Sequence, residues 1–515
     1  MILDHFQQVV PSHQLLAAFA LGLLIAVGVH VARVYTSLRH IPGPFWASFT
    51  NLQRVYWVQT ARSHEIHSHV HQGYGDFVRL GPHMVSISDP RLIPVVYPMR
   101  AGLPKGNFYR SLMPYSRQGS ALPLVFNTRD EALHKQLKKP IAPLFSLSNV
   151  LTFEHLVDQT LTVLFSQFDQ RFARKQSIPF DLGDWLQFFA FEVMGTMTFS
   201  RRYGFLEHGQ DAKGLLIAIW NFMKTAAPVT QIPWFDRLWY KNPIAAFFRP
   251  TTGMPILNIV RESINQRRER LEKGSQVGSR NEINQDDFLS RFLHIQTNDT
   301  SVPPWAVTAW TFSNVIAGSD STAAVLKTLW YNLLSNPTSK QRLYDELIEL
   351  ERKHVLSRPY PAWREIADQP YLDACVNEAI RLHPPFCLPF ERVVPVEGIT
   401  IAGRFFPGGT VIGMNPWVVN RHRPTFGEDA DCWRPDRWLG DKERYRIMEQ
   451  SILTFGAGRR VCLGKNVAML ELKKLTAALI LNYEVTILDP AQYQVENRWF
   501  FRQWGLKVQI RRRME

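Results

Sequence analysis

The longest run of apolar positions lies near the N-terminus and predicts a membrane-spanning helix. From Val9 to Ala32 the sequence contains no Lys, Arg, Asp or Glu, and a bilayer needs roughly 20 mostly apolar residues. A cleaved signal peptide is the alternative, but it carries a positive charge before its apolar run, where this chain has only Asp4. Arg33 and Arg39 follow the run, so the positive-inside rule places the rest of the chain in the cytosol.

Beyond this run the pattern predicts a mainly α-helical body with small β-sheets. Residues 77–80 and 85–88 alternate about a Gly-Pro pair as the strands of a hairpin do. Helical spacing of apolar residues covers 151–206 and 303–347, with a stop at Asn336-Pro337. No internal repeat divides the chain.

Three stretches need a separate interpretation. Residues 305–326 carry one formal charge, Asp320, but their Thr, Ser and Asn residues favour a buried core helix over a second membrane span. The polar stretch 272–287 has no period and predicts a surface loop. The histidine-rich stretch 64–71 lacks the spacing of a zinc motif, because position 68 is Ser, and predicts an exposed helix without a metal.

The net charge and the cysteine content limit the possible binding partners and the cellular compartment of the protein. The chain has 59 basic and 45 acidic residues, a formal net charge of +14, which favours anionic partners. The basic residues are scattered without a recognition-helix or finger spacing, so a membrane surface or an acidic protein fits better than nucleic acid. No cysteine pair has the C-x-x-C spacing, which indicates a reducing compartment; the cysteines are Cys375, Cys387, Cys432 and Cys462.

The strongest chemical signal is a cysteine on a glycine-rich loop that runs into an apolar helical stretch. Phe455, Gly458, Arg460, Cys462 and Gly464 mark this loop. Glycines let the backbone approach a flat ligand, and backbone N–H groups at a helix N-terminus stabilise a thiolate, which is a soft ligand for iron. The alternative is a buried structural cysteine, which the surrounding arginines and glycines make a poor fit.

This loop resembles the haem-binding loop of the cytochrome P-450 family, F-x-x-G-x-R-x-C-x-G. The resemblance implies that Cys462 is the axial ligand of the iron of haem b, and that Phe455, Gly458, Arg460 and Gly464 help to hold the haem. It also implies the cytochrome P-450 fold, mainly α with small β-sheets, here preceded by one N-terminal transmembrane helix.

A second motif resembles the structural core of the same family. Glu378 and Arg381 lie three residues apart on one predicted helix face. Arg437 lies in a segment similar to the family's aromatic-x-P-E-R-aromatic motif, with Asp436 where Glu is usual. The resemblance implies a buried structural network of Glu378, Arg381 and Arg437. Taken alone, such a pair of charges would be typical of an ordinary solvated helix.

A third motif, residues 317–322, lies in the predicted core helix 305–326 and is similar to the family's A-G-x-D-T-T segment. Burying an acid beside a hydroxyl costs free energy unless the group has partners or a task. The resemblance implies that Asp320, Ser321 and Thr322 relay protons for oxygen activation. Ser321 stands where Thr is usual, so the hydroxyl is kept while the hydrogen-bond geometry changes. An ordinary polar spot on a core helix is the alternative.

Four basic residues match positions that bind the haem propionates in the family. They are Arg460, Arg392, His134 and Lys138. The last pair stands in place of W-x-x-x-R, with His for Trp and Lys for Arg. A solvated surface charge is the alternative for each residue, and it is hardest to exclude for Lys138.

The resemblance covers nearly the whole chain and implies a monooxygenase that inserts one atom of O2 into a small, largely apolar substrate. Electrons would come from NADPH through NADPH-cytochrome P-450 reductase, with cytochrome b5 as a further candidate donor, and membrane lipid would be the other partner. The implied organisation is a lumenal N-terminus (1–11), a transmembrane anchor (12–32), a basic Pro-Gly-Pro hinge (33–48) and a cytosolic catalytic domain (49–515) in the endoplasmic reticulum membrane.

Two short stretches narrow the resemblance to fungal secondary-metabolism enzymes related to pisatin demethylase. These stretches are 105–109 and 193–205. Two rival functions stay open: a haem-thiolate isomerase or dehydratase that needs no reductase, and a non-catalytic haem sensor or carrier. Asp320 with Ser321 disfavours the first, and no attached regulatory module supports the second. The aromatic candidates for the pocket wall fit almost any apolar ligand: Trp220, Phe222, Trp234, Phe235, Trp499 and Phe500.

Overall fold

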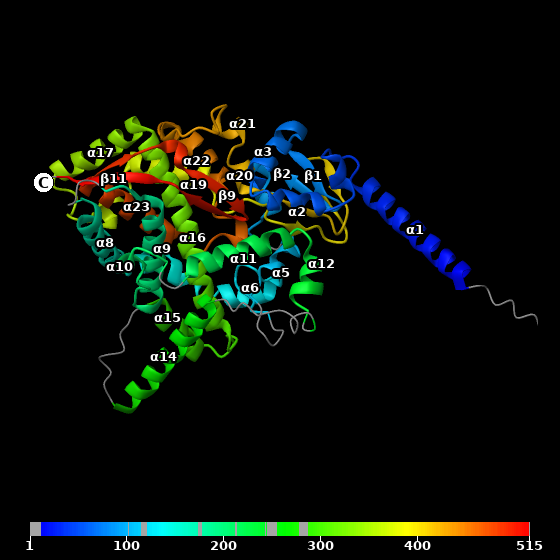
Figure 1. Ribbon diagram of the computed structural model, residues 1–515, viewed down its shortest axis with the longest axis horizontal. Helices are drawn as coiled ribbons and strands as arrows, with labels where there is room; N and C mark the ends of the chain where they lie inside the picture. The colour runs from blue at the N-terminus through cyan, green and yellow to red at the C-terminus, as the bar shows by residue number, and fades with distance from the viewer. Residues whose placement is uncertain are drawn as a thin grey trace, which may run out of the picture.

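The protein is mainly α-helical, with its small sheets at the edges of a helical core (Figure 1). The computed structural model describes residues 12–100, 102–114, 121–173, 178–211, 214–242, 244, 255–277 and 287–513. The longer helices are α1 Ser12–Ser37, α2 Leu52–Gln59, α3 Ser63–Tyr74, α6 Glu131–Lys138, α8 Glu154–Phe168, α9 Leu182–Phe199, α11 Leu215–Val229, α14 Pro255–Val277, α15 Phe288–Asn298, α16 Ala306–Ser335, α17 Pro337–Arg352, α19 Pro370–Leu382, α22 Lys442–Ser451 and α23 Lys465–Asn482.

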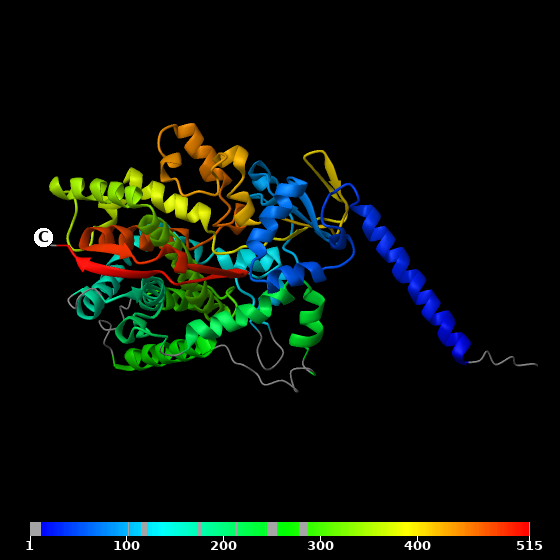
Figure 2. The same cartoon turned by 45° about the horizontal axis from the view of Figure 1, so that its top comes forward.

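Helix α16 is the centre of this core. It packs on α9, α14, α15, α19 and α23, and most of its apolar side chains are buried. In Figure 2, α14 and α17 lie at opposite edges of the helical part, with α16 between them. The helix ends at Ser335, and Pro337 begins α17, because proline cannot continue the hydrogen bonding of a helix. The prediction of a buried core helix over 305–326 is confirmed.

Within the described part of the chain, the strands form four small sheets. The predicted hairpin is confirmed, since β1 pairs antiparallel with β2 and places Phe77 opposite Ile87. The sheets have the strand orders β1-β2-β7-β4, β3-β11-β8, β10-β9 and β5-β6. The strands are β1 Phe77–Gly81, β2 Met84–Ile87, β3 Phe180–Asp181, β4 Arg392–Val393, β5 Ile399–Ile401, β6 Arg404–Phe406, β7 Val411–Gly413, β8 Tyr483–Ile487, β9 Gln494–Arg498, β10 Phe500–Trp504 and β11 Lys507–Arg512.

Short helical turns complete the chain between these elements. Among them, α5 and η7 carry residues of the cavity described below, and η6 carries Arg437. The turns are η1 Phe45–Ser48, η2 Pro90–Leu92, α4 Ile93–Val96, α5 Phe108–Ser111, η3 Ala142–Phe145, α7 Leu147–Leu151, η4 Asp169–Ala173, α10 Phe205–His208, α12 Pro233–Phe235, η5 Asp236–Tyr240, α18 Trp363–Ile366, α20 Pro416–Val419, α21 Arg423–Phe426, η6 Pro435–Trp438, η7 Gly458–Arg460 and η8 Pro490–Gln492.

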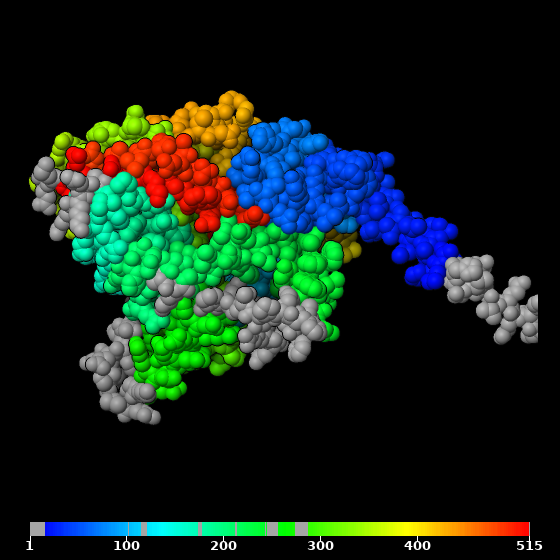
Figure 3. All heavy atoms as spheres, viewed as in Figure 1, coloured from blue at the N-terminus to red at the C-terminus, as the bar shows by residue number. Residues whose placement is uncertain are grey.

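Helix α1 stands clear of the packed body (Figure 3). Leu16–Ser37 is long and apolar enough to cross a membrane, and the helix continues five residues beyond the predicted limit at residue 32. Its last turn joins the body, because the Arg79 guanidinium donates to the Val34 carbonyl at 2.9 Å and to the Tyr35 carbonyl at 3.2 Å. The predicted lumenal segment 1–11 lies outside the described residues.

Two sequence predictions are wrong in part. The surface loop predicted from residue 272 begins later, since α14 continues to Val277, and residues 278–286 lie outside the described residues. Helix α3 is not an exposed helix, because His64, His67 and His71 are buried on one of its faces. Their i, i+3 and i+7 spacing aligns them. The rings of His64 and His67 pack against aromatic side chains, and the His71 ring hydrogen-bonds to the Gly75 carbonyl and the Ser86 hydroxyl; the aromatic partners are Trp57, Trp417 and Phe501.

Candidate active site

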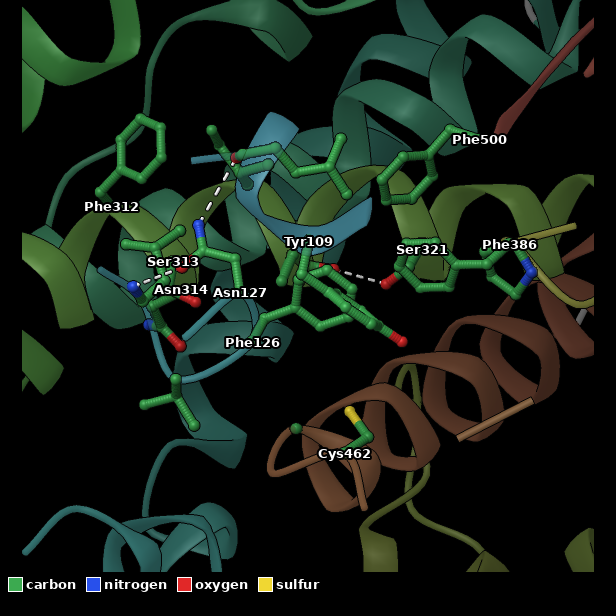
Figure 4. Close-up of a pocket in the computed structure, with 18 of the residues that line it drawn as sticks. Tyr109, Phe126, Asn127, Phe312, Ser313, Asn314, Ser321, Phe386, Cys462 and Phe500 are labelled. Atoms are coloured by element: carbon green, nitrogen blue, oxygen red, sulfur yellow. Dashed lines mark hydrogen bonds between the residues drawn. The ribbon is translucent and has the colours of Figure 1, made fainter. Parts of the chain in front are cut away.

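A cavity of about 1270 Å³ lies beside α16 and brings the predicted chemical residues together. Cys462, on the loop before α23, and Ser321, on α16, both line it (Figure 4). The Cys462 thiol lies deep in the protein, yet its surface is open because it faces the cavity. An apolar chamber that joins a thiol to a hydroxyl has the general character of a small-molecule site.

The loop of Cys462 is held in one conformation. The Cys462 N–H donates to the Phe455 carbonyl at 2.8 Å. Gly458 has a φ of +61°, which favours glycine, and a side chain there would collide with the carbonyl of Tyr97. Burial raises the pKa of the Cys462 thiol, whereas the backbone N–H of Gly464 and the charge of Lys138 lower it.

Arg460 and Arg392 reach the cavity from two different elements. Arg460 donates to the Val125 carbonyl at 3.2 Å and to the Glu131 carboxylate at 2.6 Å, and its buried Nε has no hydrogen-bond partner among the described residues. Burial lowers the pKa of Arg460, and Glu131 opposes this change. Arg392 lies 3.5 Å from the Tyr109 hydroxyl. Both guanidinium groups carry a positive charge.

His134 and Lys138 also line the cavity, one turn apart on α6. The Lys138 Nζ donates to the carbonyls of Arg459 and Val461 at 2.8 and 3.4 Å, and so fastens α6 to the cysteine loop. Burial, together with the charges of Arg460 and Lys138, lowers the pKa of His134 to about 3. The imidazole is therefore a neutral hydrogen-bonding group, and Lys138 is the cation of the pair.

These residues fit the haem that the sequence resemblance implies. The open thiol of Cys462 offers a soft ligand for iron. A Cβ at Gly464 would lie 3.9 Å from the Cys462 sulfur, so a larger side chain there would crowd the thiol. The free Nε of Arg460 and the charges of Arg392 and Lys138 suit the two carboxylates of a haem.

The acid and the alcohol of the third motif lie next to each other on α16 but face different neighbours. Ser321 and Thr322 line the cavity, and Ser321 donates to the carbonyl of Ala317. Asp320 accepts a hydrogen bond from Gln187 of α9. Burial raises the pKa of Asp320 to about 6, so near neutral pH the carboxyl group can both hold and release a proton.

Glu378, Arg381 and Arg437 form one buried cluster. Arg381 donates two hydrogen bonds to the Glu378 carboxylate, at 2.8 and 2.7 Å, and Arg437 Nε donates to it at 3.0 Å. Burial opposes the charge of Glu378, but the two arginines keep its pKa below its usual value. Asp436, which stands where Glu is usual, instead pairs with Arg342 at the surface.

Aromatic rings line much of the cavity (Figure 4). Phe222, Trp499 and Phe500 belong to this wall as predicted. Trp220, Trp234 and Phe235 do not line the cavity, and Trp234 is 62% exposed. Sequence composition could not separate these two groups, since both are aromatic residues in apolar stretches. Tyr109, Phe126 and Phe386 are among the further aromatic residues of the wall that were not predicted.

Four charged or polar residues of the site were also not predicted. Glu131 pairs with Arg460, and Gln187 donates to Asp320. Lys105 is buried beside the cavity, with its ammonium 4.0 Å from the centre of the Tyr109 ring, and Lys327 is buried on α16. A basic residue inside an apolar helical stretch is a signal that could have pointed to Lys327.

Comparisons with known proteins agree with this geometry. The family model for cytochrome P-450 matches residues 41–503. The chain is 63% identical over 494 residues to cytochrome P-450 monooxygenase AFLA_114810 of Aspergillus flavus, with 96% of each chain covered. It is 58% identical over 493 residues to cytochrome P-450 monooxygenase asR2 of Sarocladium schorii, with 95% of each covered, and 52% identical over 507 residues to cytochrome P-450 monooxygenase pkfB of Emericella nidulans, with 97% of this chain and 98% of that one covered.

Both the family model and the relatives extend well beyond the cysteine loop and include α16 and α19. The relatives are named monooxygenases, which makes this chain an oxidoreductase, and the family implies a haem iron cofactor. The chain therefore belongs to the cytochrome P-450 family.

Proposed function

We propose that this protein is a haem-thiolate monooxygenase that inserts one oxygen atom from O2 into a small, largely apolar molecule of fungal secondary metabolism. The observation that carries the proposal is that the Cys462 thiol and the Ser321 hydroxyl line the same aromatic cavity. Haem b, with Cys462 as its axial ligand, would supply the activation of oxygen in this cavity.

The residues of this chain have separate tasks in the proposed reaction. Arg460, Arg392 and Lys138 balance the charge of the haem carboxylates, and His134 adds a hydrogen bond. The aromatic wall excludes water and holds an apolar substrate by its shape. Asp320, Ser321 and Thr322 hold the protons that the reaction consumes, in which a C–H compound, O2, two protons and two electrons give an alcohol and water.

The electrons come from NADPH through a membrane-bound reductase, with cytochrome b5 as a second candidate donor. Helix α1, which is long and apolar enough to cross a membrane, anchors the protein in the endoplasmic reticulum, and the catalytic domain faces the cytosol. This arrangement puts the protein and its reductase on the same membrane surface.

Product profiling of a deletion strain tests the function. The metabolite that accumulates in the strain is incubated with microsomes that carry the full-length protein, the reductase and NADPH, under isotopically labelled O2. We expect one labelled oxygen atom in the product. A product that forms without NADPH and without the label would instead establish an isomerase or dehydratase, and an unchanged metabolite profile would favour a haem sensor.

A further inference from the structure

A chain of polar side chains lies between α9 and α16, outside the cavity lining. The Asp320 carboxylate accepts a hydrogen bond from the Gln187 amide N–H. The oxygen of the same amide accepts a hydrogen bond of 2.7 Å from Lys327 Nζ. Lys327 Nζ also lies 3.3 Å from the carbonyl of Gln503. One glutamine thus joins an acid and a base that both belong to α16.

The two charged partners fix how this amide is turned. Lys327 has only donors and an ionised Asp320 has only acceptors, so the NH2 group of Gln187 must face Asp320 and its oxygen must face Lys327. Asp320 and Lys327 are seven residues apart, close to two helical turns, and therefore lie on the same face of α16. That spacing lets a single side chain from α9 reach both.

Several acidic groups act electrostatically on Lys327, which is only 7% exposed. Burial lowers the pKa of Lys327, and Asp184, Asp181 and Asp320 raise it, whereas Arg502 lowers it. The charge of Lys327 in turn opposes the rise that burial causes in the pKa of Asp320. Asp184 is exposed at the surface, and of the three acids its charge has the largest effect on the pKa of Lys327.

Asp181, which also acts electrostatically on Lys327, has a structural role because it binds backbone N–H groups. It accepts hydrogen bonds from the N–H groups of Gly183 at 2.9 Å and Gly505 at 2.8 Å, and Lys507 Nζ lies 3.9 Å from it. Asp184 and Gln187 lie one turn apart on the same face of α9. Exposed Asp184, whose charge raises the pKa of Lys327 more than that of Asp181 does, is therefore the acid that connects Lys327 electrostatically with solvent.

We propose that Gln187 and Lys327 are positioning residues for proton supply: Gln187 holds the Asp320 carboxyl, and Lys327 holds Gln187 and links Asp320 electrostatically to exposed Asp184. This inference rests on the proposed oxygen insertion. Each turnover takes two protons from solvent by way of Asp320 and places them in the water that is formed, while NADPH supplies the two electrons. Neither Gln187 nor Lys327 lines the cavity, so both act through Asp320.

Infrared spectroscopy of the full-length holoenzyme tests the electrostatic link directly. The carbonyl band of protonated Asp320 is assigned by its loss in Asp320→Asn and is followed against pH. In Lys327→Met the midpoint should rise by roughly one pH unit, the lower end of the range for an opposite charge, because the charge of Lys327 lowers the pKa of Asp320. Lys327→Arg should keep the midpoint near that of the native protein. An unchanged midpoint in Lys327→Met overturns the proposal.

Lys340→Met is the matched control. Lys340 lies on the next helix, α17, is half-buried, and donates to the Val485 carbonyl at 2.9 Å. Lys340→Met removes a partly buried lysine that has no part in the polar chain, so the Asp320 midpoint should not move. A shift as large as that of Lys327→Met would show a general effect of charge and would also overturn the proposal.

Peroxide release tests the positioning role in turnover. With the reductase and NADPH but no added substrate, Gln187→Met should release at least about twofold more peroxide per NADPH, a small part of the roughly 10²-fold that a proton-transfer group contributes. It should also show a larger solvent deuterium isotope effect on NADPH oxidation. Equal peroxide yields and isotope effects in Gln187→Met and native protein overturn the proposal.

The two measurements separate this inference from the proposed function. If native protein performs no NADPH-dependent oxygen insertion, the proposed function fails, and the infrared midpoint still decides whether Lys327 controls Asp320. If native protein is active and the variants match it, only the inference fails. The absorption band of the reduced CO complex reports haem assembly, and if Lys327→Met does not assemble, Gln187→Met with Lys327→Arg carries the test.

Discussion

Glu378 and Arg381, one turn apart on α19, form a doubly hydrogen-bonded ion pair in which both side chains are 0% exposed. Arg437 reaches the same carboxylate from η6. Glu378→Gln would leave buried Arg381 without its counter-charge and Arg437 with Asp429 as its remaining carboxylate partner, so we expect a loss of about 3–5 kcal/mol of stability. Urea unfolding measures it. Glu443→Gln, in an exposed pair with Arg446, is the control and should lose far less stability, because exposed ion pairs contribute little; equal losses would contradict the prediction.

Replacing Cys462 tests the iron ligand. Cys462→Ala and Cys462→His should abolish the red-shifted, thiolate-type absorption of the reduced CO complex, because no other thiol lines the cavity in the described part of the chain. Cys432, a second exposed cysteine, provides the control, and Cys432→Ala should keep the band. Survival of the band in Cys462→Ala would show that the ligand is a different residue.

Ser321 should control how much oxygen ends in product. Ser321→Ala removes a hydroxyl that faces the cavity, so product per NADPH should fall and peroxide should rise while the haem spectrum stays unchanged. Ser321→Thr should keep or improve coupling, because the added methyl restricts the rotamers in a helix. Ser313→Ala, at another hydroxyl of the same wall, should couple as the native protein does. A Ser321→Ala protein that couples normally would mean that Thr322 or a water molecule carries the proton.

Truncation at Arg33 would remove most of helix α1 and keep Val34 and Tyr35, whose carbonyls bind Arg79. A chain that begins there should bind haem and lose stable membrane association, whereas the full chain sediments with microsomes. A chain that begins at Pro42 also loses Leu38 and Ile41, which are 0% and 3% exposed, at a cost of about 1.5–3 kcal/mol for each buried side chain. It should therefore unfold at lower urea concentration. Cleavage of the native N-terminus in the mature protein would contradict the anchor.

Buried histidines should make the protein sensitive to mild acid. Burial lowers the pKa of His64 and His71 to about 4 and that of His67 to about 3, against about 6.5 in an unfolded chain. Between these values the unfolded chain binds more protons, so stability is complete above about pH 6.5 and falls as the pH drops toward about 4. Each group contributes at most about 1.4 kcal/mol per pH unit.

His64→Phe isolates one of these groups. The His64 ring packs edge-on against Trp417 and Phe501 with centroid distances of 4.8 and 5.1 Å, so phenylalanine keeps the packing and removes the titration. Urea midpoints at about pH 7.5 and about pH 5.5 should differ less in His64→Phe than in native protein. An equal pH dependence would assign the acid sensitivity to other residues.

Much of the architecture could be predicted from the sequence because its signals are local. The hairpin of β1 and β2 follows from alternation about a turn, and α16 ends where Pro337 excludes a further helical hydrogen bond. The histidine face of α3 was missed for a physical reason. Polar residues usually indicate exposure, but the His64 ring meets Trp417 of α20 and Phe501 of β10, which lie far away in the sequence.

The residues of the candidate site also fall into two groups: those that a local motif marks, and those that only the packing of the fold brings there. Cys462 and Arg460 belong to one contiguous loop, so a single motif reveals both. Gln187 touches the site only because helices pack together, and nothing in its own neighbourhood marks it. Glu131 lies three residues before His134, but its ion pair with Arg460 is visible only in the fold. The sequence match at Lys138 is weak because the family motif has Arg at this position. Its bonds to the carbonyls of the cysteine loop are visible only in the three-dimensional structure.

Gly318 has no room for a side chain, since a Cβ there would lie 2.6 Å from the sulfur of Met194 on α9. The volume of the active cavity therefore depends on how Met194 of α9 packs against Gly318. A larger residue at 318 must be accommodated by a new conformation of the flexible Met194 side chain or by a shorter residue at 194. Efforts to redesign the substrate range should therefore vary Gly318 and Met194 together, because both line the cavity and each limits the size of the other.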